Sequence, residues 1–165
     1  MKIRTAKMDD LEKIVQIEAT CFPKAEAATE ESFKNRLDAF SEYFWVLEKE
    51  GEIIGFVNGM VTNCADLTDE MYENAKMHTE EGKWQMIFGL DVLPEYQCRG
   101  YAAMLMNHLI SEAEKQGRRG IVLTCKDRLI HYYAKFGFEN EGISGSTHGD
   151  VIWYQMRKTF SGKSE

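Results

Sequence analysis

A short loop in the second half of the chain carries residues suited to binding a phosphate group. Residues 97–102 read Gln-Cys-Arg-Gly-Tyr-Ala, and a segment with an apolar helical face follows at once. Gly100 and Ala102 are small enough for an anion to approach the main chain, and Gln97 and Arg99 offer side-chain donors. The free N–H groups of the following helix would face the same point, which predicts an anion site. An ordinary strand-to-helix turn at Gly100 is the alternative interpretation.

A second candidate group is a carboxylate on the apolar side of a helix near the N-terminus. Leu11, Ile14, Val15 and Phe22 recur at helical spacing, and Glu18 falls in the middle of their stripe. Burial raises the pKa of a carboxyl group unless a cation compensates it, so Glu18 is a candidate base or ammonium anchor. A buried glutamate satisfied by backbone donors explains the position equally well.

The elements that would position these groups follow a mixed α/β pattern, of the α+β kind. Periodicity predicts helices over residues 11–22, 29–37, 102–116 and 128–136, and strands over residues 2–7, 43–48, 52–62, 84–92, 121–125, 138–143 and 151–158. Gly89 lies inside the predicted central strand 84–92 and indicates a bulge or a close backbone approach. Residues 63–83 form an acidic excursion with spacing for one short helix. This excursion is either a lid that includes His78 or a solvated charged face.

Length and charge limit the classes of function. The 165 residues fit one domain over 1–160 followed by a polar tail at 161–165, and the net charge is −7. An acidic chain is a poor partner for nucleic acid or for an anionic membrane surface, so we expect neither. The longest apolar stretch, residues 53–61, is too short and too interrupted to span a bilayer, and the N-terminus lacks the apolar core of a signal peptide. We therefore expect a cytoplasmic protein.

The cysteines and histidines are widely spaced along the sequence. Neither a Cys-x-x-Cys pair nor a two-histidine cluster with a carboxylate can be drawn from them, so free thiols and no metal are expected. These residues are Cys21, Cys64, Cys98 and Cys125, together with His78, His108, His131 and His148.

The order of strand, Gln97-x-x-Gly100-x-Ala102 loop, helix, strand and the run Tyr132 to Phe138 resembles the GNAT superfamily of acyl-CoA-dependent N-acyltransferases. The resemblance implies a mixed, mostly antiparallel sheet of about seven strands, splayed at its middle and flanked by about four helices. It implies acetyl-CoA as cosubstrate and main-chain contacts of Leu90, Asp91 and Val92 with the pantetheine arm. The pyrophosphate cradle would comprise Gln97, Cys98, Arg99, Gly100, Tyr101, Ala102 and Ala103.

The resemblance also supplies catalytic candidates. It places Tyr133 beside the thioester sulfur as the acid for the leaving thiolate, with a plain core tyrosine as the alternative. A partial likeness to arylalkylamine N-acetyltransferases extends over Ile17-Glu18, residues 65–68 and residues 123–127. Those enzymes carry two histidines on the central strand where this sequence has Met86 and Phe88, so no histidine relay is expected. Asp91 would lie on the opposite face of that strand from Phe88, in a structural role.

Together these features predict an acetyl-CoA-dependent N-acetyltransferase that acts by direct attack in a ternary complex. The expected acceptor is a small primary amine, cationic because of the acidic excursion and Glu18. A protein or peptide N-acetyltransferase shares all the cofactor residues, and a non-catalytic acyl-CoA sensor would keep only the phosphate loop. The sequence does not decide whether the chain forms a homodimer.

Overall fold

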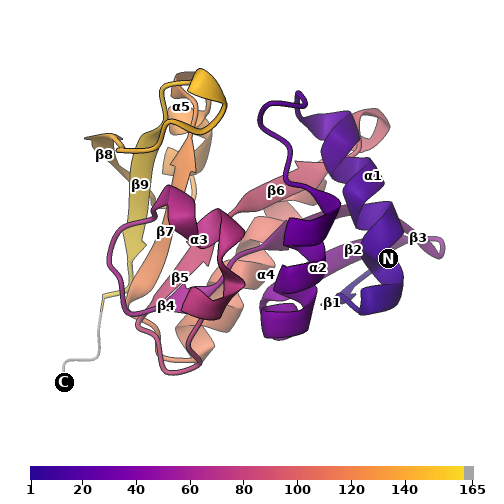
Figure 1. Ribbon diagram of the computed structural model, residues 1–165, viewed down its shortest axis with the longest axis horizontal. Helices are drawn as coiled ribbons and strands as arrows, with labels where there is room; N and C mark the ends of the chain where they lie inside the picture. Colours follow the sequence, from indigo (N-terminus) through magenta and orange to yellow (C-terminus); the bar gives the residue numbers. More distant parts are fainter. Residues whose placement is uncertain (162–165) are drawn as a thin grey trace.

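The computed structural model describes residues 1–161 as two sheets that diverge from a common fork (Figure 1). The first sheet has the strand order β1-β2-β3-β6 and is antiparallel throughout. Its strands are β1 (Lys2–Thr5), β2 (Phe44–Lys49), β3 (Glu52–Asn58) and β6 (Gly89–Val92). The second sheet has the order β4-β5-β7-β9-β8, and within it β5 and β7 run parallel. Its strands are β4 (Val61–Thr62), β5 (Trp84–Ile87), β7 (Gly120–Cys125), β8 (Glu139–Ile143) and β9 (Tyr154–Thr159).

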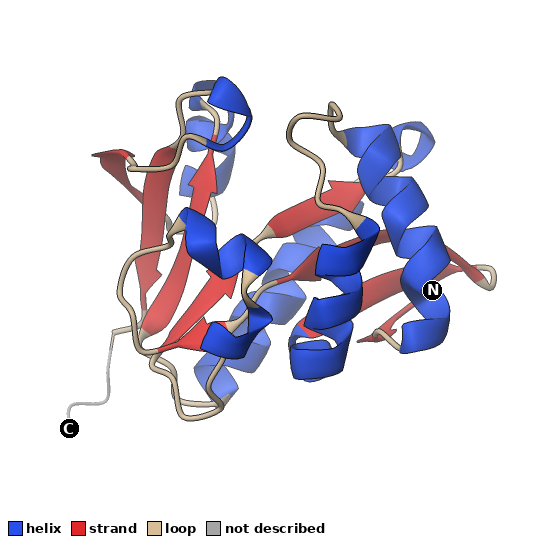
Figure 2. Cartoon of the chain, in the orientation of Figure 1, coloured by secondary structure: helices blue, strands red, loops and turns tan. Residues whose placement is uncertain are grey.

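The helices cover both faces of the first sheet (Figure 2). On one face lie α1 (Leu11–Cys21) and α2 (Glu30–Phe40), whose Ile17 and Phe33 are buried with Phe56 of β3. On the other face α4 (Tyr101–Lys115) buries Leu105 and Leu109 and extends across to β7. Two short helices, α3 (Asp69–Glu73) and α5 (Ile130–Ala134), flank the second sheet. The amphipathic helices therefore hold the first sheet between two apolar layers.

The fork arises because two long predicted strands each break in the middle. Residues 84–92 divide at Phe88 into β5 and β6, and residues 52–62 divide after Asn58 into β3 and β4. The Phe88 N–H donates to the Asn58 carbonyl over 2.7 Å, which joins the two sheets where they part. A side chain on Gly59 would collide with the Met86 carbonyl, so only glycine allows the two backbone segments to approach this closely. The splayed sheet is confirmed, with the break one residue before Gly89.

These breaks explain why the number of strands differs from the sequence prediction. Residues 1–161 contain nine strands where seven were expected, because each broken strand counts twice. They contain five α-helices, the fifth being the short α3 in the acidic excursion. Most of the polar tail expected at 161–165 lies outside the described residues.

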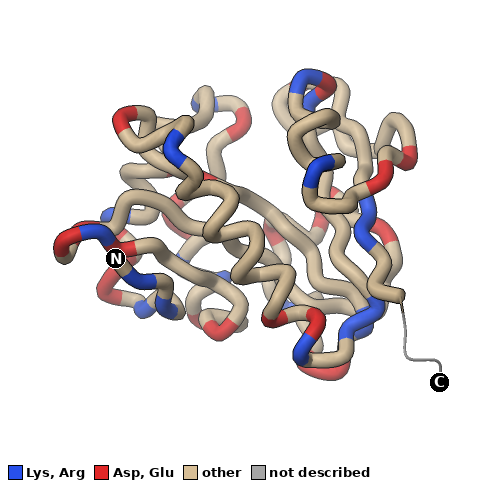
Figure 3. The backbone as a smooth tube through the Cα atoms, turned by 180° about the vertical axis from the view of Figure 1, so that it is seen from behind, with Lys and Arg blue, Asp and Glu red and all other residues tan. Residues whose placement is uncertain are grey.

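The surface carries charges of both signs. Lysines and arginines are interspersed with aspartates and glutamates along the chain (Figure 3). Within residues 1–161, no helix combines the length and apolar character needed to cross a membrane.

Candidate active site

A pocket of about 240 Å³ lies at the fork between the two sheets. Its walls are mostly apolar and come from both sides of the fork: Phe22, Ile87, Phe88, Leu90, Leu123 and Leu129. Its polar lining residues include Glu18, Arg36, Asn58 and Tyr133, which come from four different elements. An apolar cavity with a few convergent polar groups is the usual form of a small-molecule site.

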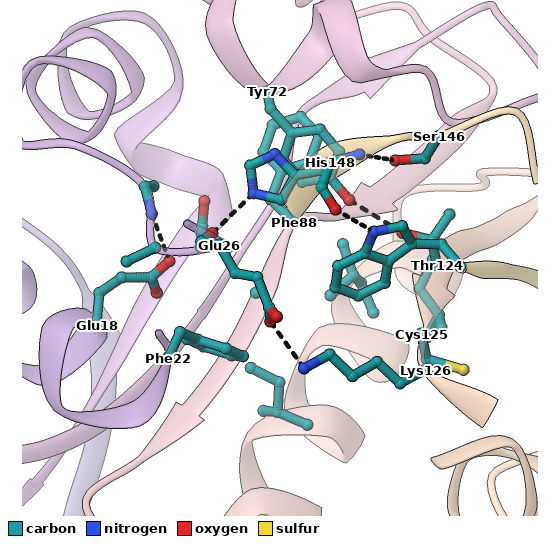
Figure 4. A pocket seen from close by; sticks show the side chains of 18 of the residues that line it. Glu18, Phe22, Glu26, Tyr72, Phe88, Thr124, Cys125, Lys126, Ser146 and His148 are labelled. Atoms are coloured by element: carbon teal, nitrogen blue, oxygen red, sulfur yellow. Dashed lines mark hydrogen bonds and ion pairs between the residues drawn. The ribbon is translucent and has the colours of Figure 1, made fainter. Parts of the chain in front are cut away.

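Glu18 is placed by α1, as its position on the apolar stripe predicted. Its side chain is only 7% exposed, and Oε2 accepts a hydrogen bond from the Ala28 N–H over 2.9 Å (Figure 4). The other oxygen, Oε1, is buried and has no hydrogen-bond partner within residues 1–161. The backbone-satisfied alternative is therefore true of one oxygen, and the second lies in the buried cluster with Asp91.

Arg36 of α2 is the cation beside Glu18. Its guanidinium donates to Asn58 Oδ1 and to the Tyr72 carbonyl, each over 3.1 Å, and lies 4.8 Å from the centre of the Phe88 ring. Burial lowers the pKa of Arg36 to about 10, so the group still carries its charge near neutral pH. Arg36 was missed in the sequence, although it lies one turn from Phe33 on the apolar side of its helix, the same signal that identified Glu18.

Asp91 lies behind Glu18 in the same cluster. Its side chain is 1% exposed, and neither carboxylate oxygen has a hydrogen-bond partner within the described chain. Burial raises the pKa of Asp91 well above its usual range, and the nearby Glu18 carboxyl adds to the rise. The sequence analysis expected Asp91 on the opposite face of the strand from Phe88, and both residues lie near Arg36. The strand break at Phe88 interrupts the alternation on which that expectation rested.

Tyr133 enters the pocket from α5, on the opposite wall from Glu18. Its ring packs edge-on against Phe138 and Tyr132. Burial raises the pKa of its hydroxyl strongly, so the group keeps its proton at neutral pH. The neighbouring Cys125 thiol has its pKa raised by burial to about 11, which makes it a poor nucleophile.

Residues from three loops meet at the mouth of the pocket (Figure 4). Glu26, from the loop between α1 and α2, forms an ion pair of 2.9 Å with Lys126, which follows β7. The His148 ring Nε2 donates to the Glu26 carbonyl over 2.8 Å, and Trp153 Nε1 donates to the His148 carbonyl over 2.7 Å. These contacts link the two sides of the fork beside the pocket. Sequence reasoning missed all four residues, because loop contacts leave no periodic signal.

The acidic excursion takes little part in the pocket. Of residues 63–83, only Tyr72 and Glu73 line it. His78 packs against Phe40 and Tyr43, and its Nδ1 accepts the Val61 N–H over 3.0 Å. The lining includes three carboxylates and three cations: Glu18, Glu26 and Glu73, against Arg36, Lys126 and Arg128.

The candidate anion loop follows β6, the strand that borders the pocket through Leu90. Gly100, at φ +87°, immediately precedes α4, and a Cβ built on it would meet no protein atom within 4 Å. The first N–H groups of α4, at Tyr101, Ala102 and Ala103, have no partner within the helix. Exposed Arg99 lies 6.0 Å from the Tyr96 ring centre. The structure thus leaves space and donors for an anion at this point.

The Gln97 side chain differs from the expectation that it donates into the loop. Its Nε2 donates instead to the Val92 carbonyl over 2.9 Å and ties the loop back to β6. Exposed Cys98 adopts a positive φ of 63° beside it. β6 is an edge strand of the first sheet, so one side of its main chain has no strand partner.

Among residues 1–161, no three histidine, cysteine or acidic side chains are placed to hold a metal ion. The charge of Arg36 interacts with both carboxyl groups at the fork, Glu18 and Asp91.

Comparison with known proteins gives a family and a fold. A model of the Acetyltransferase (GNAT) family matches residues 11–138. Probable hydrolase YhcX of Bacillus subtilis (strain 168) is 29% identical over 179 aligned positions, which cover 98% of this chain and 34% of that protein. Serotonin N-acetyltransferase of Mesocricetus auratus is 26% identical over 110 positions, which cover 66% of this chain and 52% of that protein. The chain thus spans about a third and about half of these relatives.

Solved structures share the fold at low identity. The loading GNATL domain of CurA from Lyngbya majuscula has a TM-score of 0.86 at 18% identity, covering 96% of both chains. The GphF GNAT-like decarboxylase, solved with isobutyryl-CoA, has a TM-score of 0.82 at 20% identity, covering 96% of this chain and 99% of that one. The PaiA N-acetyltransferase from Thermoplasma acidophilum, solved with coenzyme A, has a TM-score of 0.72 at 16% identity, covering 96% and 98%.

Proposed function

The chain belongs to the acetyltransferase (GNAT) family, and on this premise we propose that it transfers the acetyl group of acetyl-CoA to the primary amine of a small molecule. The observation that carries the proposal is the pocket at the fork, which both Glu18 and Tyr133 line. One group is suited to take a proton from the amine, and the other to supply one to the leaving thiolate.

The cofactor would lie along the free edge of β6. The pyrophosphate would bind the N–H groups before and within the first turn of α4, next to Gly100, and the pantetheine arm would pair with the main chain of residues 90–92. This brings the thioester to Leu90 and the fork. The coenzyme A and isobutyryl-CoA complexes of PaiA and GphF, which share the fold, support an acyl-CoA ligand.

The chemistry would proceed by direct attack. The neutral amine forms a bond to the thioester carbonyl carbon, and the C–S bond then breaks. Tyr133 donates to the departing sulfur, and its oxygen recovers a proton from the new amide nitrogen, so the hydroxyl is regenerated. Main-chain N–H groups on the β6 edge would polarise the carbonyl oxygen. An acyl-cysteine intermediate is disfavoured, because burial keeps Cys125 in its thiol form.

The small volume of the pocket and the contacts across its mouth favour a small acceptor over a protein one. Glu26, Lys126 and His148 form contacts across the mouth of the pocket, and its volume of about 240 Å³ is below the ~300–1,000 Å³ typical of ligand sites. A peptide acceptor would need a groove open to the surface. The balanced charge of the lining also means that a cationic acceptor would be held by the deep carboxyl groups and not by the pocket as a whole.

The test is the release of free coenzyme A thiol from acetyl-CoA in the presence of tryptamine, spermidine, kanamycin or a short peptide with a free N-terminus. The proposal expects at least one of the non-peptide amines to raise the rate above the rate without amine. A protein that binds acetyl-CoA but releases thiol with none of them would be a sensor. Release with the peptide alone would reassign the acceptor class.

A further inference from the structure

We propose that Glu18 and Asp91 share one proton and act as a pair, in which Glu18 takes the proton of the incoming amine and Asp91 sets how tightly Glu18 holds it. The inference rests on the proposed function, because it assigns the proton acceptor of that reaction. The arrangement is carried by four buried side chains from four elements: Glu18 of α1, Arg36 of α2, Asn58 of β3 and Asp91 of β6.

The free polar atoms of this cluster converge on one point. A Cβ built on Gly89 would lie 3.3 Å from Asp91 Oδ1, 3.6 Å from Asn58 Nδ2 and 4.0 Å from Glu18 Oε1. Each of these three atoms is buried without a hydrogen-bond partner in the described chain. Buried polar groups in folded proteins are nearly always paired, so atoms left free around one point mark a place where a ligand or proton is accommodated.

Charge balance requires a proton on the pair. Arg36 neutralises one carboxylate, and a second uncompensated carboxylate in this buried position would be costly. The other titratable groups near the pair are Cys21, Tyr72 and Tyr133, and burial raises the pKa of each, so they are uncharged at neutral pH. The free protein therefore holds one proton between Glu18 and Asp91, on the Asp91 side.

This state makes the pair an acceptor for the amine proton. An ammonium group that reaches Glu18 Oε1 adds a positive charge, which drives the shared proton from Asp91 to solvent. The ammonium then passes one of its own protons to Glu18, and the amine is left neutral. The pair again holds one proton, and the amine is ready to attack. One proton is released to solvent for each amine bound, and no other reactant is needed.

Asp91 acts through Glu18 and not on the substrate. Glu18, Asn58 and Gly89 line the pocket, whereas Asp91 lies behind them with 1% exposure. Asp91 is therefore a positioning residue, and its role is to keep Glu18 basic enough to take a proton from an ammonium group. A lone carboxylate beside Arg36 would be a weaker base.

The first test needs no ligand. Side-chain carboxyl carbons labelled with ¹³C are titrated in the wild type and in Asp91→Asn, and the melting temperature is followed over the same pH range. We expect one protonated carboxyl of the pair near pH 7, absent in Asp91→Asn. The pKa of Asp91 is higher in the folded protein than its value of ~4 in the unfolded chain. Wild-type stability therefore falls as the pH rises above ~4. Asp91→Asn lacks this loss, so its melting temperature should rise relative to that of the wild type with increasing pH.

Asp10→Asn is the matched control. Asp10 is also buried, but it is hydrogen-bonded to Arg4, whose guanidinium lowers the pKa of Asp10. Its variant should lose stability at neutral pH, and the loss should vanish in acid, which is the opposite pattern. Finding both Glu18 and Asp91 ionised near pH 7 would overturn the shared proton.

The second test is the pH profile of kcat/KM with the amine that gives the highest rate in the thiol-release panel. Asp91→Asn should move the acidic limb to lower pH by at least about one unit and reduce the maximum by about tenfold or more. Asp10→Asn should leave the limb in place. A lower rate with an unmoved limb would make Asp91 merely structural and would overturn the pair, while acetyl transfer itself would stand. If no amine raises thiol release, both the proposed function and the catalytic role of the pair fail. The carboxyl titration would still decide separately whether Glu18 and Asp91 share a proton.

Discussion

Replacing Gly100 by alanine should abolish the stabilisation of the protein by acetyl-CoA, and Gly117→Ala gives the matched control. The two glycines lie at opposite ends of α4, at φ +87° and +78°, and a Cβ on either meets no protein atom within 4 Å. Each alanine therefore costs the same left-handed strain of about 1–2 kcal/mol. For a chain of this size, that lowers the melting temperature by about 2–8 °C in both variants.

The two variants should differ only when the cofactor is present. At a concentration 100 times its Kd, acetyl-CoA stabilises the folded wild type by about 2.7 kcal/mol, a rise of about 5–10 °C. Gly117→Ala should keep this rise, since its methyl group is remote from the loop. In Gly100→Ala the methyl group occupies the open space through which the pyrophosphate would approach the N–H groups of α4.

The assay is differential scanning fluorimetry with an acetyl-CoA titration, checked by calorimetric Kd values. Equal shifts in Gly100→Ala and Gly117→Ala would refute the assignment of the loop. A shift lost in both variants would mean that strain in α4, and not access to the loop, controls binding.

Two further variants test the catalytic groups and the buried cation. Tyr133→Phe should leave the Kd for acetyl-CoA nearly unchanged and lower kcat by about 10²-fold, because the ring still packs but the proton donor to the thiolate is lost. Unchanged single-turnover rates would mean that Tyr133 serves only in packing. Arg36→Met should lower the free energy of unfolding, measured in urea near neutral pH, by about 3–5 kcal/mol, because it leaves Glu18 and Asp91 buried without their cation. A decrease of less than about 1 kcal/mol would show that the pair does not depend on Arg36.

Much of the fold could be read from the sequence because helix and strand periodicity report directly on burial. Glu18 was found as a polar residue inside an apolar stripe, and the loop at Gly100 was found from small residues before a helix. Arg36 carries the same signal as Glu18, and Asn58 and Asp91 are polar positions in otherwise buried strands. These three could have been predicted from the rule that identified Glu18.

Other features depend on tertiary contacts and leave no local pattern. The break at Phe88 accompanies the close backbone contact of Gly59 with Met86, which joins segments that are far apart in sequence. The contacts formed by Glu26, Lys126 and His148 join three loops. The acidity of residues 63–83 left two interpretations open, a lid or a solvated charged face, and Asp66 and Glu80 are paired with Arg157 and Tyr43, away from the pocket.

The central claim is that the fork pocket joins an acetyl group to an amine, and isotope tracing tests it most directly. [¹³C₂]Acetyl-CoA is incubated with the protein and the best amine of the panel, and free thiol and labelled N-acetyl product are quantified together by mass spectrometry. The expected result is one labelled amide per thiol released, with Tyr133→Phe and Glu18→Gln both slowed. Thiol and labelled acetate formed at the same rate with and without amine, and no labelled amide, would show hydrolysis in place of amine transfer and would contradict the claim.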